Sequence, residues 1–314
     1  MRSKPVLSIC IPTRNRSECL KCNLMSILKQ KPYKDGLVEV LVADNASTDD
    51  TQDIMVDFVN RFNVRYIRNN VNIGSEENYK LCINNATGQF IKIINDKVFF
   101  LDNSLNEIIK LIIDNQKEMP QIYFSNRDLF SVEHFHFFDF LYRETFRITS
   151  LKTISLWSID KELVNNDSSC DSNRLWCANA NLKLAKNKND VLIVDMKLFV
   201  EQLPRMIVFD YPLFKVFHTE FVRLCSKYLE RFDDKCFCID HIEKDLFFVF
   251  FRNWVYIYDN RDKDDSIYKF ITDENLHEEV FNYCKTKKFY FRWLLCYYEY
   301  VIKCKILNLI RGKR

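Results

Sequence analysis

The chain of 314 residues is 47% hydrophobic and carries a formal net charge of +3. That length and apolar content suffice for one large domain, or for one domain with a smaller appendage. The near-balance of charge argues against a protein built around a strongly basic face, so we expect no nucleic-acid partner. No stretch of about 18 uncharged apolar residues occurs, so no membrane-spanning helix is predicted.

The cysteines and the N-terminal residues bear on the compartment. Twelve cysteines are scattered along the chain, and the first residues lack the apolar region of a signal peptide. Neither pattern indicates a disulfide framework or a secretory route. The sequence therefore predicts a cytoplasmic protein with free thiols.

Strands and helices alternate over the first 125 residues. Apolar, β-branched runs predict the strands, and amphipathic segments between them predict the helices. The expected strands are 6–11, 38–43, 64–68, 90–95 and 121–125, and the expected helices are 17–30, 50–61, 75–86 and 103–115. This alternation is typical of an α/β fold with a doubly wound, mostly parallel sheet.

The pattern changes after residue 125. Strand-like runs at 146–158 and 191–195 flank one helix at 172–187, which gives this part of the chain a mixed α+β character. Beyond it the chain is expected to be helical, with helices at 211–231, 240–259, 274–285 and 287–310. We therefore divide the chain into three regions, 1–125, 126–205 and 206–314.

Four short motifs follow one another in the first region. They are LSICIPTRNR (7–16), VEVLVADNASTDDT (38–51), NVNIGSEEN (70–78) and GQFIKIINDK (88–97). Three of them are apolar runs that end in polar residues, as a buried parallel strand does when it delivers side chains to a site. In an open α/β sheet, ligands bind in the crevice at the carboxyl ends of such strands.

Together the four motifs resemble the nucleotide-sugar half of a family 2 glycosyltransferase with the GT-A fold, of the kind that builds bacterial surface polysaccharides. The resemblance makes 1–125 the nucleotide-sugar-binding half, 126–205 the acceptor-binding half and 206–314 a helical C-terminal region. It implies an inverting transfer of a hexose or N-acetylhexosamine from a nucleotide sugar, expected to be a UDP-sugar, to a glycan or polyprenyl-linked acceptor. The pathway it implies is O-antigen or capsule synthesis.

The resemblance assigns a set of residues to the nucleotide sugar. In the family, the aspartate matching Asp44 contacts the base, and the asparagine matching Asn78 lies near the base and ribose. Asn78 could equally be a buried polar residue that ties a loop to the sheet, and the residues after Asp44 also suit a helix cap. The full set is Pro12, Thr13, Arg14, Asn15, Asp44, Asn45, Ser47, Asn72, Gly74, Asn78, Asn95, Asp96 and Lys97.

Two arginines follow the first strand. Arg14 and Arg16 could meet phosphate oxygens, because the guanidinium fork matches their geometry. They could also be surface residues at the start of a helix. The sequence leaves both interpretations open.

The fourth motif departs from the family pattern. Family members usually carry two or three consecutive aspartates here; one binds ribose, and the last holds a divalent metal at the diphosphate. In this chain Asp96 matches the ribose ligand and Lys97 falls on the metal ligand. A protonated lysine cannot coordinate a metal, but it can place positive charge beside the diphosphate. We therefore expect weak or absent dependence on Mg²⁺ or Mn²⁺, with Asp96 as the metal ligand if the register differs by one residue.

An inverting transfer needs a general base for the acceptor hydroxyl. In this fold the base usually comes from the acceptor half, near the start of a helix. Asp171 is our first candidate and Asp167 the second. Asp171 could instead be the N-cap of the helix that follows it.

Two other functions stay open. A nucleotidyltransferase of the same architecture would need a glycine-rich phosphate loop after the first strand, and PTRN (12–15) lacks those glycines. A degenerate transferase that binds nucleotide or glycan, or acts as a scaffold, is suggested by Asn95 and Lys97 in place of aspartates. Binding of a nucleotide without turnover would favour this second alternative.

The last predicted helix combines apolar residues at helical spacing with a basic end. The apolar set is Phe291, Leu294, Leu295, Tyr298, Val301, Ile302 and Leu309, and the basic set is Lys303, Lys305, Arg311, Lys313 and Arg314. Such a helix could lie in a membrane interface, which would place the protein peripherally at the inner face of the plasma membrane. It could equally be a core helix or form a homodimer contact.

Overall fold

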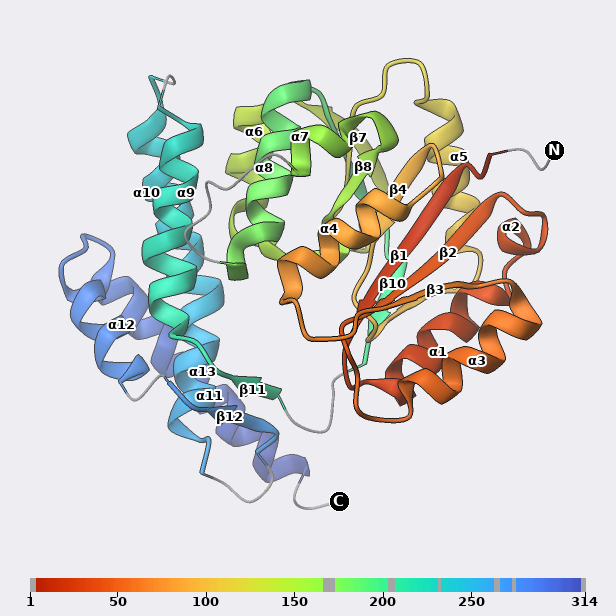
Figure 1. The fold of residues 1–314 in the computed structure, drawn as a ribbon. Coiled ribbons are helices and arrows are strands. Elements are labelled where there is room, and N and C mark those ends of the chain that lie inside the picture. Colours follow the sequence, from red (N-terminus) through yellow and green to blue (C-terminus); the bar gives the residue numbers. More distant parts are fainter. Residues whose placement is uncertain are drawn as a thin grey trace. The chain divides into compact units, whose positions relative to one another are not determined.

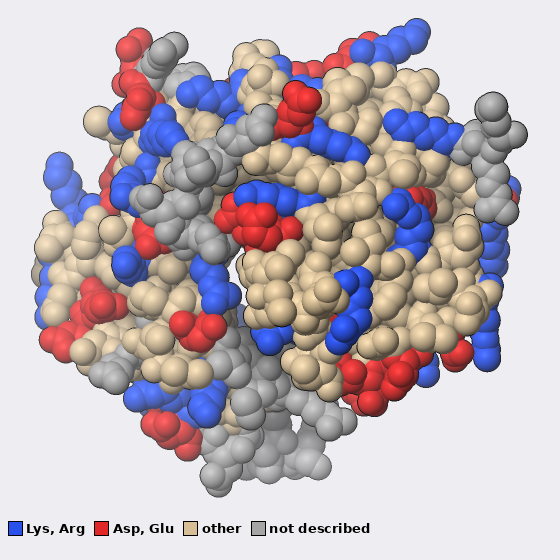
Figure 2. Space-filling view, viewed as in Figure 1, with Lys and Arg blue, Asp and Glu red and all other residues tan. Residues whose placement is uncertain are grey.

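The computed structural model describes residues 4–165, 173–202, 207–230, 233–262, 266–272 and 275–311. By packing, the chain divides into two compact units, Met1–Gln202 and Leu203–Arg314. Figure 1 labels most of the helices and strands of each unit. Figure 2 colours the charges on one face, where basic and acidic side chains of the described residues are interspersed among large uncharged areas.

The first unit is built on a five-stranded sheet of order β3-β2-β1-β4-β8. Its strands are β1 (Leu7–Thr13), β2 (Val38–Asp44), β3 (Arg65–Arg68), β4 (Phe90–Ile93) and β8 (Ser155–Trp157). The first four are parallel, and β8 is antiparallel to β4. The strand order reverses between β1 and β4, so their carboxyl ends form a topological switch point.

Helices cover both faces of this sheet (Figure 1), which confirms the doubly wound prediction. One face packs against α1 (Ser17–Leu28), α3 (Thr51–Phe62) and α5 (Ser104–Asp114), and the other against α4 (Ser75–Asn85) and α8 (Trp176–Lys188). Successive residues of β1 alternate between these two layers. Ile9 and Ile11 belong to the first core and Cys10 to the second, which is why the strand is apolar throughout.

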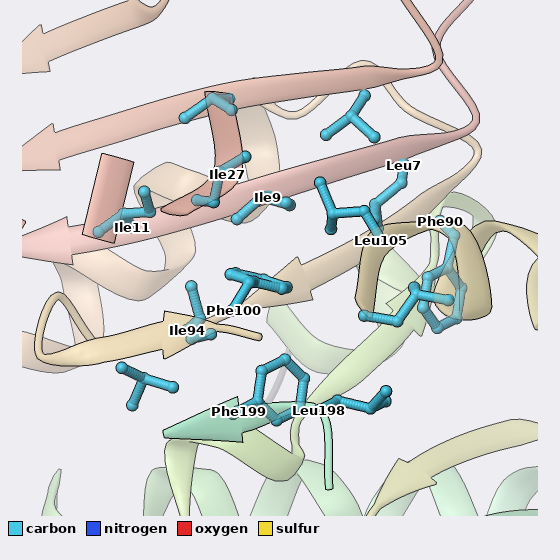
Figure 3. Packing of buried hydrophobic residues seen from close by; sticks show 14 of the residues in the cluster. Leu7, Ile9, Ile11, Ile27, Phe90, Ile94, Phe100, Leu105, Leu198 and Phe199 are labelled. Atoms are coloured by element: carbon cyan, nitrogen blue, oxygen red, sulfur yellow. The ribbon is translucent and has the colours of Figure 1, made fainter. Parts of the chain in front are cut away.

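Figure 3 shows the first of these cores from close by. Leu7, Ile9 and Ile11 lie along β1 near Ile27 of α1 and Leu105 of α5, and all five are fully buried. The core extends to a short antiparallel pair, β5 (Val98–Phe100) with β10 (Phe199–Glu201), which the sequence did not predict. The ring of Phe100 in β5 packs edge to face against the ring of Phe199 in β10, with centroids 5.1 Å apart.

A smaller sheet of order β6-β9-β7 completes the first unit. Its strands are β6 (Gln121–Phe124), β9 (Val191–Asp195) and β7 (Ser131–Phe135), followed by helix α6 (Phe137–Glu144). The predicted strands at 121–125 and 191–195 are confirmed, whereas β7 and α6 were not predicted. The described residues of this unit also form two short α-helices, α2 (Lys31–Lys34) and α7 (Lys161–Asn165).

The prediction of a strand at 146–158 is wrong for most of these residues. The chain forms two short 3₁₀ helices, Thr145–Thr149 and Leu151–Thr153, and is extended only in β8. The hydroxyl of Thr149 donates to the carbonyl of Phe146, and that of Thr153 to the carbonyl of Ser150. These local bonds offer the backbone an alternative to a sheet ladder, so β-branched composition misleads here.

The second unit is helical, as predicted. Its elements are a π-helical turn (Lys215–Glu220) leading into α9 (Phe221–Tyr228), α10 (Lys235–Asp245), a second π-helical turn (Leu246–Phe251), α11 (Arg252–Asp259), α12 (Leu276–Lys285) and α13 (Tyr290–Arg311), with a short parallel pair, β11 (Ile207–Phe209) and β12 (Tyr268–Phe270). The indole of Trp293 is fully buried and donates to the carbonyl of Phe247 at 2.7 Å. Within the described ranges, no helix is both long enough and apolar enough to span a bilayer.

Candidate active site

The carboxyl ends of β1, β2 and β4 bring three predicted site residues to one edge of the sheet. The register sets Thr13 opposite Asp44, and Cys10 opposite Ile93, so the chain beyond Ile93 reaches the same edge. There the hydroxyl of Thr13 donates to Asp96 Oδ2 at 2.8 Å. Thr13, Asp44 and Asp96 are all buried. Residues from three separate motifs therefore form one polar cluster at the switch point.

Asp44 is fully buried at the end of β2, and three groups surround its carboxylate. Oδ1 accepts from the backbone N–H of Ser47 at 2.9 Å, while Oδ2 accepts from the Tyr66 hydroxyl at 2.7 Å and lies 3.4 Å from Arg68 Nε. Burial, with the hydrogen bond to Asp44, raises the pKa of the Tyr66 hydroxyl and keeps it a donor.

Sequence reasoning missed Tyr66 and Arg68. Both lie on β3, whose register sets Tyr66 opposite Val42 and Arg68 opposite Asp44. The signal was available in principle, because Tyr66 and Arg68 are polar groups two positions apart and share one face of a predicted strand. What the sequence lacked was the pairing of that strand with β2.

The loops after β1 and β2 are joined by hydrogen bonds. The backbone N–H of Asn15 donates to Ser47 Oγ at 2.9 Å, and the backbone N–H of Thr48 donates to Asn15 Oδ1 at 2.7 Å. Asn15 adopts a φ of 53°, a left-handed conformation that asparagine tolerates. Pro12 is buried beneath these loops, whereas Arg14 is exposed.

A network of asparagine side chains holds the third motif. Asn45 donates through Nδ2 to Asn72 Oδ1 at 2.7 Å, and Asn69 donates to Asn45 Oδ1 and Asn78 Oδ1. Asn78 in turn donates through Nδ2 to the buried carbonyl of Ala43 at 2.9 Å. Asn78 therefore ties the loop to β2, which is the structural role that the sequence left open for it.

Two of the four glycines are required by the backbone of this sheet, Gly74 at the carboxyl edge and Gly88 at the amino end of β4. Gly74 has φ 88° and ψ 164°, a region open to glycine almost alone, and its carbonyl accepts from Asn45. A Cβ built on Gly88 would lie 2.6 Å from the backbone nitrogen of Ser8. Gly88 thus allows the chain to enter β4 in close contact with β1.

The fourth motif contributes one buried carboxylate and one paired lysine. Asp96 is held by Thr13 through Oδ2 and by Arg16 through Oδ1; burial raises the pKa of Asp96, and the Arg16 charge opposes that rise. Lys97 Nζ lies 2.6 Å from Glu201 Oε1 of β10, a partner that the sequence could not suggest. Within the part of the chain that is described, no group of three or more acidic, histidine or cysteine side chains could hold a metal ion.

The two candidate general bases, Asp167 and Asp171, lie outside the described residues. The chain is described again from residue 173, and α8 begins at Trp176. The Trp176 ring packs against Tyr79 of α4 with centroids 5.0 Å apart. The start of α8 therefore packs against α4, whose first turn is part of the third motif.

The sequence model described as Glycosyl transferase family 2 matches residues 8–164, which is half of the chain. The chain belongs to this family. The abequosyltransferase RfbV of Salmonella typhimurium is 33% identical over 116 residues, which cover 36% of this chain and 34% of RfbV. The chain spans about a third of the length of the first curated relatives it matches.

Solved structures confirm the GT-A fold of this family 2 member. A TarS fragment from S. aureus in complex with UDP-GlcNAc superposes with a TM-score of 0.61 at 18% identity, covering 80% of this chain and 75% of that one. The mannosyltransferase PcManGT from Pyrobaculum calidifontis, in complex with GDP-Man and Mn²⁺, gives a TM-score of 0.56 at 14% identity and covers 98% and 88%. The family and fold predicted from the four motifs are thus confirmed.

Proposed function

We propose that this protein transfers a hexose or N-acetylhexosamine, with inversion, from a UDP-sugar to a glycan or polyprenyl-linked acceptor. The reaction would serve the synthesis of a bacterial surface polysaccharide such as O-antigen or capsule. The observation that carries the proposal is the convergence of Thr13, Asp44 and Asp96 at the switch point of the sheet, where doubly wound folds bind nucleotides. The likeness to RfbV and to a structure holding UDP-GlcNAc supports the reaction class.

In this proposal Asp44 and Arg68 read the base. The imide N–H of uracil lies between two carbonyl oxygens, so a carboxylate beside a guanidinium offers an acceptor and a donor to the same edge. Asp44 and Arg68 form such a pair, with Oδ2 and Nε 3.4 Å apart. Asp96 would accept from ribose hydroxyls.

The transfer itself needs a base. The acceptor oxygen would attack the anomeric carbon, the bond from that carbon to the diphosphate oxygen would break, and the base would take the hydroxyl proton. Asp171 is our first candidate for the base and Asp167 the second. Asp171→Asn should abolish transfer while leaving UDP affinity unchanged, and near-normal turnover would assign the base elsewhere.

Release of UDP from a panel of UDP-sugars, with lipid-linked and synthetic glycan acceptors, tests the activity. Turnover with any pair supports the proposal. Nucleotide binding without turnover for every pair would contradict it and favour the degenerate transferase. Asp44→Ala should weaken UDP binding. The matched control is Asp57→Ala, which removes an exposed carboxylate on α3 and should leave UDP binding unchanged. Equal affinity of the two variants would remove Asp44 from the base pocket.

We propose also that α13 docks on an anionic membrane surface, which would place the protein at the cytoplasmic face of the plasma membrane. The observation is an exposed apolar stripe at helical spacing; its members are Phe291, Leu295, Tyr298, Ile302 and Ile306. Helix geometry sets Arg292 and Lys303 on one side of this stripe and Lys305 on the other. Cations that flank an apolar stripe suit the headgroups of anionic lipids.

Co-sedimentation with vesicles tests the docking. Binding to vesicles that contain anionic lipid, lost on Leu295→Glu together with Ile302→Glu, would support it. Binding unchanged by that double variant would contradict it. Concentration-dependent dimerisation, abolished by the same variant without vesicle binding, would assign the stripe to a second copy instead.

A further inference from the structure

Arg16 bridges two residues near the end of the fourth motif, Asn95 and Asp96. Its Nη1 lies 3.1 Å from Asp96 Oδ1 and 3.3 Å from Asn95 Oδ1. The side chain of Asp96 is only 4% exposed, whereas that of Arg16 is 41% exposed. One nitrogen of the guanidinium is therefore anchored on a buried carboxylate, and the group still reaches solvent at the carboxyl edge of the sheet.

The guanidinium keeps donors for a ligand. An arginine has five N–H donors in a planar fork. Both hydrogen bonds of the Arg16 side chain to described residues use Nη1, which leaves Nε and Nη2 without a partner among those residues. Such a pair of nitrogens matches two oxygens of a phosphate group.

A divalent metal does not fit the residues at this edge. Each oxygen of Asp96 already accepts one hydrogen bond, from Arg16 or from Thr13, so a metal ion would have to share this carboxylate with the Arg16 cation. The position where the family pattern puts the metal-binding carboxylate holds Lys97, whose ammonium is bound to Glu201. An entering cation would meet the charges of Arg16 and Lys97. The described residues contain no group of three or more acidic, histidine or cysteine side chains that could hold a metal ion without the substrate.

Further charged side chains surround Lys97. Glu201 lies between two ammonium groups, with Lys97 at 2.6 Å and Lys152 at 3.7 Å. Together with the pair of Arg16 and Asp96, these side chains carry three positive and two negative formal charges. A fixed cationic group thus stands at the place in the motif where the family pattern puts a metal ligand.

We propose that the Arg16 guanidinium, held by Asp96, binds the diphosphate of the donor and replaces the divalent metal. This inference rests on the proposed function. When the bond between the anomeric carbon and the β-phosphate oxygen breaks, its electron pair stays on that oxygen, and negative charge grows there. A preorganised cation stabilises that growing charge without metal coordination. Arg16 is therefore assigned a catalytic role that sequence analysis left undecided.

Calorimetric titration of the full chain with uridine and with UDP, in EDTA and in Mn²⁺, tests the assignment. Wild type should bind UDP equally well in both buffers. Arg16→Ala should bind UDP about 10- to 100-fold more weakly than wild type in EDTA, with uridine affinity unchanged, because only the phosphates lose a partner. Arg16→Lys should lie between them, since it keeps the charge and loses the fork.

Two comparisons sharpen the test. The matched control is Arg61→Ala, which removes an exposed arginine at the end of α3 and should bind UDP as wild type does. Arg16→Ala also frees Asp96 Oδ1, so Mn²⁺ should restore part of its UDP affinity, an effect that a merely structural role of Arg16 would not produce.

The inference has clear contrary outcomes. If EDTA abolishes UDP binding by the wild-type protein, the inference is overturned, while the proposed function stays intact. Equal loss of uridine and UDP affinity in Arg16→Ala would overturn it as well, by making Arg16 structural. Failure of wild type to bind UDP, CDP or GDP would overturn the proposed function and this inference together.

Discussion

Glu243 joins three helical segments of the second unit through one buried carboxylate. Oε1 lies 3.2 Å from His218 Nε2 and accepts from the Tyr283 hydroxyl at 2.6 Å, and Oε2 accepts from Lys287 at 2.7 Å. Burial alone would raise the pKa of Glu243, which is 7% exposed. The three contacts outweigh burial and lower that pKa to about 2.

We expect Glu243→Gln to destabilise the second unit by about 3 kcal/mol at neutral pH, since the ordinary pKa of glutamate is about 4.3 and each unit of difference is about 1.4 kcal/mol. Because the native pKa is depressed, the carboxylate contributes fully above about pH 4.3, and the contribution is lost as the pH falls through about 2. The difference between wild type and Glu243→Gln should therefore shrink by about 1.4 kcal/mol per pH unit across that window.

Urea unfolding of the full chain at a series of pH values measures this difference. Hydrogen exchange in peptides from α10 and α12 identifies the second unit as the part that is destabilised. Glu230→Gln, which removes an exposed carboxylate of the same unit, is the matched control. A Glu243→Gln variant as stable as Glu230→Gln at neutral pH, or a difference that does not change with pH, would refute the reasoning.

Three further predictions concern the first unit. Gly74→Ala should cost about 1–3 kcal/mol of stability and weaken UDP binding, whereas Gly36→Ala, at a similar φ of 76° but ahead of β2 and outside the third motif, should strain the backbone and leave UDP affinity unchanged; calorimetry that finds equal affinities would contradict this. Gly88→Ala should lower the melting temperature more than Gly36→Ala, since its Cβ would lie 2.6 Å from a backbone nitrogen of β1; the reverse order would contradict the close contact. Tyr66→Phe removes a donor to the buried Asp44 carboxylate and should cost about 1–3 kcal/mol in urea unfolding; an unchanged midpoint would contradict that role.

The sheet of the first unit was predictable because its signals are local. Buried parallel strands are continuous apolar runs, and the helices between them are amphipathic, so β1, β2 and β4 lie where the sequence predicts them, as does β9 of the smaller sheet. The same sequence predicted that Asp44 and Asp96 end two strands of one sheet edge.

Two kinds of prediction failed: those where local side-chain hydrogen bonds compete with strand formation, and those where a short strand forms only by pairing with another strand. Short 3₁₀ helices stand where a strand was expected at 146–158, because threonine hydroxyls there form hydrogen bonds to nearby backbone carbonyls. The short strand β5 has only three residues, too few for a periodic signal, and exists because β10 pairs with it. Short runs of this kind are decided by the partner strand and not by their own composition.

The sequence by itself determined the family, the order of the strands and helices in the first sheet, and the residues that reach its carboxyl edge. Only the tertiary structure decided which side chains meet there. Arg16 lies 80 residues from Asp96 in the chain, and Lys97 is paired with Glu201 of a strand that was not predicted. Periodicity and capping are properties of neighbouring residues, whereas these ion pairs depend on strand order and register, which follow from packing of the whole core.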